Sequence, residues 1–368
     1  MLCRYSLEIG PGDTVLIDGP ALAQPLFVEV VKAVTEAGAH PMLRPRLDRA
    51  DAALLEGASD AQIAAITKLD EVEVEAPTRA LTIWANTNTR YMSGVPSETQ
   101  AARAAAMRPL FERFLAREAA GDARWCGTAF PCHAAAQDAG MSLSEWEDFV
   151  YRAGHLDDPD PIAFWREQSK RQAAVAERFT GVREIRILAE DTDLVLDVAD
   201  RIWDNADGHK NFPDGEVYTS PVESATQGHI AFSFDATYMG NDVAGVRLTF
   251  DGGRVVEHEA TRGADFLGRM LDMDAGARYL GEVAFGMNDE IQVPTRDTLF
   301  DEKIGGTCHV ALGMAFPECG GTNTSGLHWD LVCDLRRGGE IHADGEVIAR
   351  DGRFLWPIPA SSGWPTSS

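Results

Sequence analysis

Apolar and polar positions in the first part of the chain follow the pattern of strands alternating with helices. The run TVLIDG (14–19) predicts a buried strand, and LFVEVVKAVTEAG (26–38) places apolar residues at helical spacing before ending at a glycine. HPML (40–43) begins a second strand. RALTIWANTN (79–88) predicts a third, followed by a helix over 98–117. This strand–helix–strand order predicts a parallel sheet.

Two further amphipathic segments precede residue 180. Residues 142–154 and 162–179 have apolar positions at the helical period, and each predicts a helix. Ser144 and Glu147 have the spacing of a capping box, which places the start of the first of these helices beside them.

Beyond residue 180 the pattern becomes that of short strands separated by glycine-containing turns. These strands are predicted over residues 181–198, 246–260 and 338–355. We therefore predict an N-terminal α/β domain with a mainly parallel sheet over residues 1–180. A C-terminal α+β domain is predicted over residues 181–368.

Composition narrows the class of protein. The chain has 368 residues, of which 45% are hydrophobic, so it can bury the cores of two ordinary domains. Its formal net charge of -25 argues against nucleic acid and anionic membranes as partners. Such an excess is typical of a salt-rich cytoplasm, but a genome biased towards Asp, Ala and Arg codons gives the same composition.

Sequence signals that are missing exclude other classes. No apolar run of about 18 residues occurs, and MLCRYSLEIGPGD lacks the order of a secretory signal. We therefore expect a cytoplasmic protein without a membrane partner. The six cysteines include no CxxC pair, and GPGDTVLIDG is neither a GxGxxG nor a Walker motif, so neither a thiolate zinc site nor a nucleotide site is indicated.

The segment SGLHWDLVCDLR (325–336) contains the first candidate for chemistry. In a strand, His328 and Asp330 share one face while Trp329 points to the other. An imidazole nitrogen beside a carboxylate oxygen suits a divalent metal such as Zn²⁺, Co²⁺, Mn²⁺ or Fe²⁺. A hydrogen bond between the two side chains inside a core is the alternative that this short pattern leaves open.

Three other segments place acids or a histidine inside apolar sequence. Glu216 follows a Pro-Asp-Gly turn, Glu282 begins an apolar run, and His309 lies within one. An isolated buried carboxylate is very costly, so each glutamate needs a partner. Together with His328 and Asp330, these residues suggest a shared metal pair.

Five motifs in order resemble the M29 family of metalloaminopeptidases, also called the aminopeptidase T family. The similarity extends over nearly the whole chain, and its main motifs are PDGEVYTSP, LGEVAF, TLFDEKIGGTCHVALGMAFPE, GGTNTSGLHWD and ADGEVIARDGRF. The resemblance implies an aminopeptidase that acts on peptides with a free N-terminus and works as a homodimer. It also implies two divalent metal ions (Zn, Co or Mn).

The resemblance also implies a role for each site residue. The metal ligands it implies are Glu216, Glu282, His309, His328 and Asp330. Asp330 would bridge the metals, while Glu282 would be either a ligand or the acid/base group. Glu282 or Glu216 would carry the proton from the attacking water to the leaving amine.

One position departs from the family pattern. Phe316 stands where the family has a tyrosine, so the ring is present and the hydroxyl donor is missing. Tyr218, Tyr238 or a backbone amide could replace that donor. We expect lower activity, because losing one such donor typically costs a factor of about 10²–10³ in rate.

Two alternatives remain open from the sequence. His309, His328 and Asp330 alone would serve a mononuclear iron dioxygenase that opens aromatic rings, although such a site does not need Glu216 and Glu282. The other alternative is a weakly active or non-catalytic metal-binding homologue.

Overall fold

The structure is a computed structural model that describes residues 1–355 of the chain. The residues form two compact units, 1–154 together with 208–212, and 155–207 together with the chain from 213 onwards. The domain boundary near residue 180 stays a prediction, and residues 356–368 of the predicted C-terminal domain lie outside the described residues.

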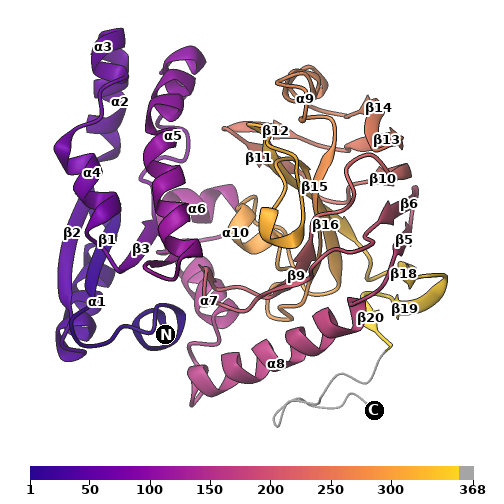
Figure 1. The fold of residues 1–368 in the computed structure, drawn as a ribbon, viewed down its shortest axis with the longest axis horizontal. Coiled ribbons are helices and arrows are strands. Elements are labelled where there is room, and N and C mark those ends of the chain that lie inside the picture. Colours follow the sequence, from indigo (N-terminus) through magenta and orange to yellow (C-terminus); the bar gives the residue numbers. More distant parts are fainter. Residues whose placement is uncertain (356–368) are drawn as a thin grey trace. The chain divides into compact units, whose positions relative to one another are not determined.

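A five-stranded parallel sheet forms the centre of the first unit (Figure 1). Its strands, in spatial order, are β2 (His40–Arg46), β1 (Thr14–Pro20), β3 (Arg79–Trp84), β4 (Arg124–Ala129) and β8 (Asn211–Phe212). All neighbouring strands pair in parallel, as the strand–helix–strand pattern predicts. The last of them, β8, is supplied by residues far along the chain.

Helices in the first unit follow the predicted periodicity. Helix α1 packs against β1 and β2, and the buried side chains of Phe27, Val30 and Val34 form its apolar face. The helices of this unit are α1 (Gln24–Glu36), α2 (Asp48–Gly57), α3 (Asp60–Ile63), α4 (Lys68–Glu75), α5 (Ser97–Ala119), α6 (His133–Asp138) and α7 (Leu143–Ala153).

The capping box predicted at the start of α7 from Ser144 and Glu147 is wrong by two residues. Ser142 is the N-cap, and its side chain accepts from the backbone N–H of Glu145 while Glu145 accepts from that of Ser142. Both serines have a glutamate three residues later, and the first of them is the N-cap of the helix.

Two antiparallel sheets make up most of the second unit (Figure 1). The larger consists of β14 (Arg254–Glu259), β13 (Arg247–Asp251), β10 (Gln227–Ala231), β6 (Thr192–Asp197), β5 (Glu184–Ala189), β18 (Glu340–Ala343), β19 (Glu346–Arg350) and β20 (Arg353–Phe354). The smaller consists of β17 (His328–Asp334), β16 (Thr307–Gly313), β15 (Leu280–Gly286), β9 (Glu216–Thr219) and β7 (Asp204–Ala206). A two-stranded ribbon, β11 (Ala236–Tyr238) and β12 (Asn241–Val243), accompanies them.

One hydrophobic core joins these two sheets. It contains Ile185, Ile187 and Leu194 from the larger sheet and residues of β15, β16 and β17 from the smaller one. Helix α8 (Pro161–Phe179) contacts β7 and β9, and it contributes Val175 and Phe179 to this core. Short helices α9 (Ala264–Leu271) and α10 (Thr298–Asp301) complete the unit. The core therefore covers one face of the smaller sheet, and the side chains on the other face do not belong to this core.

None of the helices in residues 1–355 combines the length and the apolar character that a membrane crossing requires.

Candidate metal centre

The five predicted ligands lie on four neighbouring strands of the smaller sheet. Glu216 begins β9, Glu282 lies on β15, His309 on β16, and His328 and Asp330 on β17. All five side chains lie on the same face of this sheet, since alternate residues of a strand point the same way. The residues that alternate with them along each strand point into the hydrophobic core. Strand pairing alone therefore gathers the predicted ligands.

The register explains why the carboxylates of Glu282 and Asp330 approach each other. Both residues pair with Ala311 of the strand between them, so they stand in one row across the sheet. Ala311 has only a methyl group, which leaves space above the middle strand for the two longer side chains. Glu282, His309 and Asp330 each place one ligand atom within 4.8 Å of the other two.

An irregularity in β15 sets the position of Glu282. The pairing of β15 with β16 shifts between Leu280 and Glu282, which is the mark of a β-bulge. Gly281 occupies the bulge, and a Cβ atom there would lie only 2.0 Å from the carbonyl oxygen of Met314. Only glycine fits this approach of two backbones.

The Glu282 carboxylate lies between the two imidazoles. Its Oε1 is 3.6 Å from His309 Nε2, and its Oε2 is 3.4 Å from His328 Nε2. The outer carboxylates complete the row, with Glu216 Oε2 3.6 Å from His309 Nε2 and Asp330 Oδ1 3.6 Å from His328 Nε2. Each separation exceeds hydrogen-bond length, as expected where a cation fits between the atoms.

Several atoms of the cluster are buried without a hydrogen bond among the described residues. These are Oε2 of Glu216, both ring nitrogens of His309 and Oδ1 of Asp330. Buried polar atoms are nearly always satisfied, so such a group requires an explanation. Nitrogen and carboxylate oxygen donors suit Zn²⁺, Co²⁺ or Mn²⁺, and the residues present therefore fit the predicted ions.

His328 is oriented by a backbone carbonyl. Its Nδ1 lies 3.0 Å from the carbonyl oxygen of Met314, which can only accept, so Nδ1 carries the hydrogen. The other nitrogen, Nε2, faces Glu282 and Asp330 and is the one that would bind a cation. Outer partners of this kind commonly fix the tautomer of metal-binding histidines.

Without a cation, protons compensate the charge of the cluster. Burial lowers the pKa of His309, but Glu282 and Glu216 outweigh it and raise that pKa to about 9. Burial also opposes the charge on His328, yet Asp330 and Glu282 raise its pKa to about 10. Burial raises the pKa of Glu282, but both imidazoles lower it to about 2. An incoming cation must therefore displace protons from the imidazoles.

The two outer carboxylates behave differently from Glu282. Burial raises the pKa of Glu216 to about 8, although Lys303 and His309 act against it. Burial together with the charge of Glu302 raises the pKa of Asp330 to about 7. A buried cluster with this many acids favours any added positive charge.

Lys303 and Glu302 complete this cluster. Lys303 is fully buried, and its Nζ lies 2.9 Å from Glu216 Oε1 and forms a short ion pair with Glu302. It also lies 3.9 Å from Asp214. Lys303 thus holds one oxygen of Glu216 and leaves the other facing His309. The segment DEK (301–303) predicts only a salt-bridged turn or support for His309, because nothing local shows that its lysine is buried.

The hydroxyl that Phe316 lacks is not replaced by Tyr218. The Tyr218 hydroxyl donates to Asp204 at 2.8 Å, and its ring packs at 5.0 Å from that of Phe316. Tyr238 stacks on Trp329 and packs against the hydrophobic core. The Phe316 ring lies 5.4 Å from that of His328, so an apolar edge borders the cluster at this point.

Comparisons with known proteins show which family the chain belongs to. The family model described as thermophilic metalloprotease (M29) matches residues 1–354. The chain belongs to this family. The resemblance seen in the sequence motifs is thereby confirmed, and so is the predicted enzyme class, a metallopeptidase and therefore a hydrolase.

One relative matches nearly the whole chain, and another matches about half of it. Aminopeptidase 2 of Geobacillus stearothermophilus is 27% identical over 405 residues, covering 98% of this chain and 95% of that protein. Aminopeptidase T of Thermus thermophilus is 33% identical over 189 residues, covering 47% and 45%. The solved structure of wild-type AmpT from Thermus thermophilus superposes with a TM-score of 0.82 at 22% identity, covering 96% of this chain and 97% of that one. This M29 protein therefore has the AmpT fold, mixed α/β with one parallel sheet and antiparallel sheets.

Proposed function

We propose that this protein is an aminopeptidase that removes the first residue from peptides, using two divalent cations. The observation that carries the proposal is the position of Glu282, whose two carboxylate oxygens face two different imidazoles. The names of the relatives, all of them aminopeptidases, support the same reaction.

The donor set divides into two groups that share Glu282. Glu216 and His309 would hold one cation, and His328 and Asp330 the other. Glu282 is the central carboxylate and would lie within reach of either cation, whereas the family resemblance gave the shared position to Asp330. Zn, Co and Mn all suit these donors. When bound, a pair of cations polarises a carbonyl and acidifies a water molecule at neutral pH.

The residues of the chain supply the remaining steps. The acidic cluster attracts the α-ammonium of a peptide, which restricts cleavage to the N-terminus. Glu282 is ionised at neutral pH, because the imidazoles lower its pKa to about 2. Either Glu282 or Glu216 would accept a proton from water and pass it to the leaving amine.

The iron dioxygenase is a weaker candidate. A mononuclear site would use His309, His328 and one carboxylate, and would have no use for the buried acids Glu216 and Glu282. The M29 family match also favours hydrolysis. A weakly active homologue remains the second candidate, because Phe316 supplies no hydroxyl. We further propose a homodimer, which light scattering during size-exclusion chromatography measures directly.

Release of free amino acid from short peptides tests the proposal. We expect wild-type protein loaded with Co²⁺, Zn²⁺ or Mn²⁺ to release the first residue, with two cations bound per chain by elemental analysis. Glu282→Gln should lower kcat by roughly 10²–10⁴, the usual contribution of a general base. Glu340→Gln is the matched control, because Glu340 bonds His342 on the larger sheet and should keep wild-type activity. Wild-type protein inert with all three metals would reject the proposal.

A further inference from the structure

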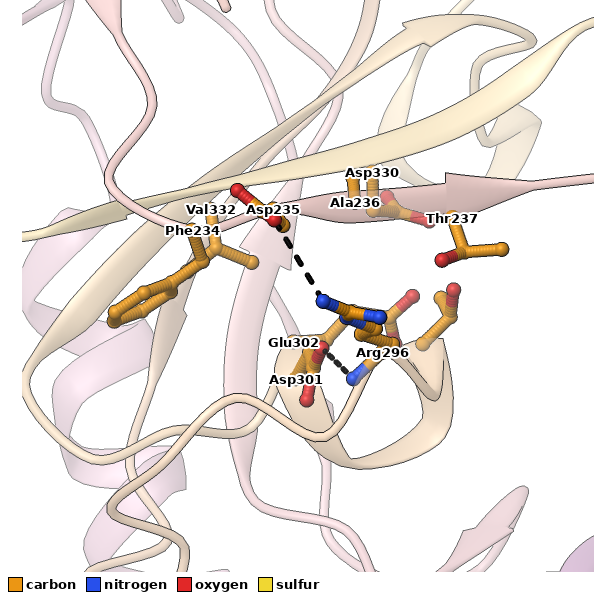
Figure 2. A pocket seen from close by; sticks show the side chains of 10 residues that line it. Phe234, Asp235, Ala236, Thr237, Arg296, Asp301, Glu302, Asp330 and Val332 are labelled. Atoms are coloured by element: carbon orange, nitrogen blue, oxygen red, sulfur yellow. Dashed lines mark hydrogen bonds and ion pairs between the residues drawn. The ribbon is translucent and has the colours of Figure 1, made fainter. Parts of the chain in front are cut away.

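A pocket beside the metal centre contains a single arginine among several acids. Glu302 and Asp330 form part of its wall and connect it to the cluster, while Phe234 and Val332 give it an apolar side. Figure 2 shows Arg296 in the middle of these side chains, with its guanidinium directed towards Asp235. The pocket therefore has a positive group next to a centre that is otherwise acidic.

The backbone at Arg296 is held in an uncommon conformation. Its φ is +65°, in the left-handed region that residues with a side chain rarely adopt. The Arg296 N–H donates to Asp301 Oδ2 at 2.8 Å, and the backbone and hydroxyl of Thr295 donate to Asp301 Oδ1. Asp301 thus fixes the turn that presents the arginine to the pocket. Strained residues of this kind concentrate at ligand sites.

The Arg296 guanidinium has no hydrogen bond to another side chain among the described residues. Its nearest carboxylate oxygen is Asp235 Oδ2, at 3.7 Å. That same oxygen already accepts from Arg262 at 2.8 Å. Asp301 and Glu302, which also line the pocket, have partners of their own, since Asp301 caps the turn and Glu302 pairs with Lys303. The donors of Arg296 are therefore available to a ligand.

We propose that Arg296 binds the C-terminal carboxylate of short peptide substrates, a subsite that rests on the proposed aminopeptidase function. A planar guanidinium can grip a carboxylate with two parallel hydrogen bonds. The α-ammonium of the same peptide lies at the acidic metal centre, so the two ends of a zwitterion meet opposite charges. Asp330 belongs both to the cluster and to the wall of the pocket, so the two sites adjoin and a short peptide is the substrate suited to reach both.

Paired substrates with and without the terminal charge test the subsite. We expect wild-type kcat/KM for Leu-Leu and Leu-Gly-Gly to exceed that of their C-terminal amides by roughly 10- to 100-fold, the effect of hydrogen bonds to a charged group. Arg296→Gln should reduce this acid-to-amide ratio to near one, and Arg296→Lys should keep part of it. The amide substrate measured on the same variant reports whether the site is still folded.

Arg186→Gln is the matched control for the loss of one positive charge. Arg186 pairs with Asp193 on the larger sheet and lies outside the pocket, so its variant should keep the wild-type ratio. A wild-type ratio near one would overturn the subsite while leaving the aminopeptidase proposal intact. An equal loss in Arg186→Gln would also overturn it, because the effect would then be general charge and not contact.

Binding without turnover separates the two proposals. Calorimetric titration with Leu-Leu whose peptide bond is reduced to CH₂–NH, as the acid and as the amide, needs no hydrolysis. The acid should bind wild-type protein more tightly than the amide by the same factor, and Arg296→Gln should remove the difference. Equal affinities would overturn the subsite whether or not the protein hydrolyses peptides.

Discussion

At the scale of single residues, Phe316 stands where the family resemblance predicts a tyrosine. Its ring packs between Tyr218 and His328, and the Tyr218 phenol already donates to Asp204. The site therefore offers a metal centre with an apolar edge where a hydroxyl donor is expected.

Phe316→Tyr should raise the activity of the loaded enzyme. The new hydroxyl would add a donor beside His328 that can stabilise developing negative charge, so kcat should rise by up to about 10²–10³. Initial rates of amino-acid release at saturating peptide measure the change. Phe316→Leu removes the ring without adding a donor and should show no gain. A tyrosine variant no faster than wild type would mean that another group already supplies this contact.

Lys303 is the residue on which the charge balance beneath the metal centre depends. Its ammonium is fully buried between Glu216 and Glu302, so removing it leaves two buried carboxylates without their cation. Breaking a buried ion pair from one side typically costs 3–5 kcal/mol. We expect Lys303→Met to lower the free energy of unfolding in urea by about 3–5 kcal/mol.

An exposed lysine provides the comparison for that variant. Lys170 pairs with Glu167 on the surface of α8, where ion pairs contribute about 0–1 kcal/mol. Lys170→Met should therefore change unfolding by less than about 1 kcal/mol. Similar losses in both variants would show that burial of the Lys303 charge does not matter for stability.

At the scale of secondary structure, the β-bulge in β15 controls where Glu282 lies. Gly281 approaches the backbone of Met314 so closely that a methyl group would meet its carbonyl carbon at 2.4 Å as well as its oxygen. Any side chain must push β15 away from the segment that follows β16. The Glu282 carboxylate would move with it.

Gly281→Ala should therefore weaken both stability and metal binding. Overpacking at a tight site typically costs 1–3 kcal/mol, and we expect a loss of about that size in urea unfolding. Calorimetric titration with Zn²⁺ should show weaker binding. Gly57→Ala is the control, because nothing lies within 4 Å of a Cβ there. Wild-type metal affinity in Gly281→Ala would show that the bulge does not position Glu282.

At the scale of the whole molecule, the excess of acidic residues affects stability. A net charge of -25 makes the folded chain repel itself, and salt screens that repulsion. The urea midpoint should therefore rise between 0.05 M and 1 M NaCl, while an uncharged solute of equal osmolarity reports the non-ionic contribution. A midpoint that falls with salt would mean that the surface ion pairs outweigh the net repulsion.

The sequence predicted the elements with strong periodicity and the nature of the ligands. The strand at 14–19 and the helix at 26–38 form nearly as predicted, because buried side chains at period two or 3.6 leave few alternatives. The start of α7 was predicted two residues too late, because two nearby serines offer the same capping spacing. Local patterns thus specify an element more reliably than its ends.

The sequence alone determined that acids and histidines interrupt apolar strands, and therefore that they need a partner. Only the tertiary structure decided that Glu282 stands between both imidazoles, that Lys303 is buried beside Glu216, and that Arg296 faces a pocket that Asp330 also lines. The reason is that these distances depend on strand register and on the close approach at Gly281, which join segments far apart in the chain. A pattern along one strand reports which face a side chain occupies, but not which side chains it meets there.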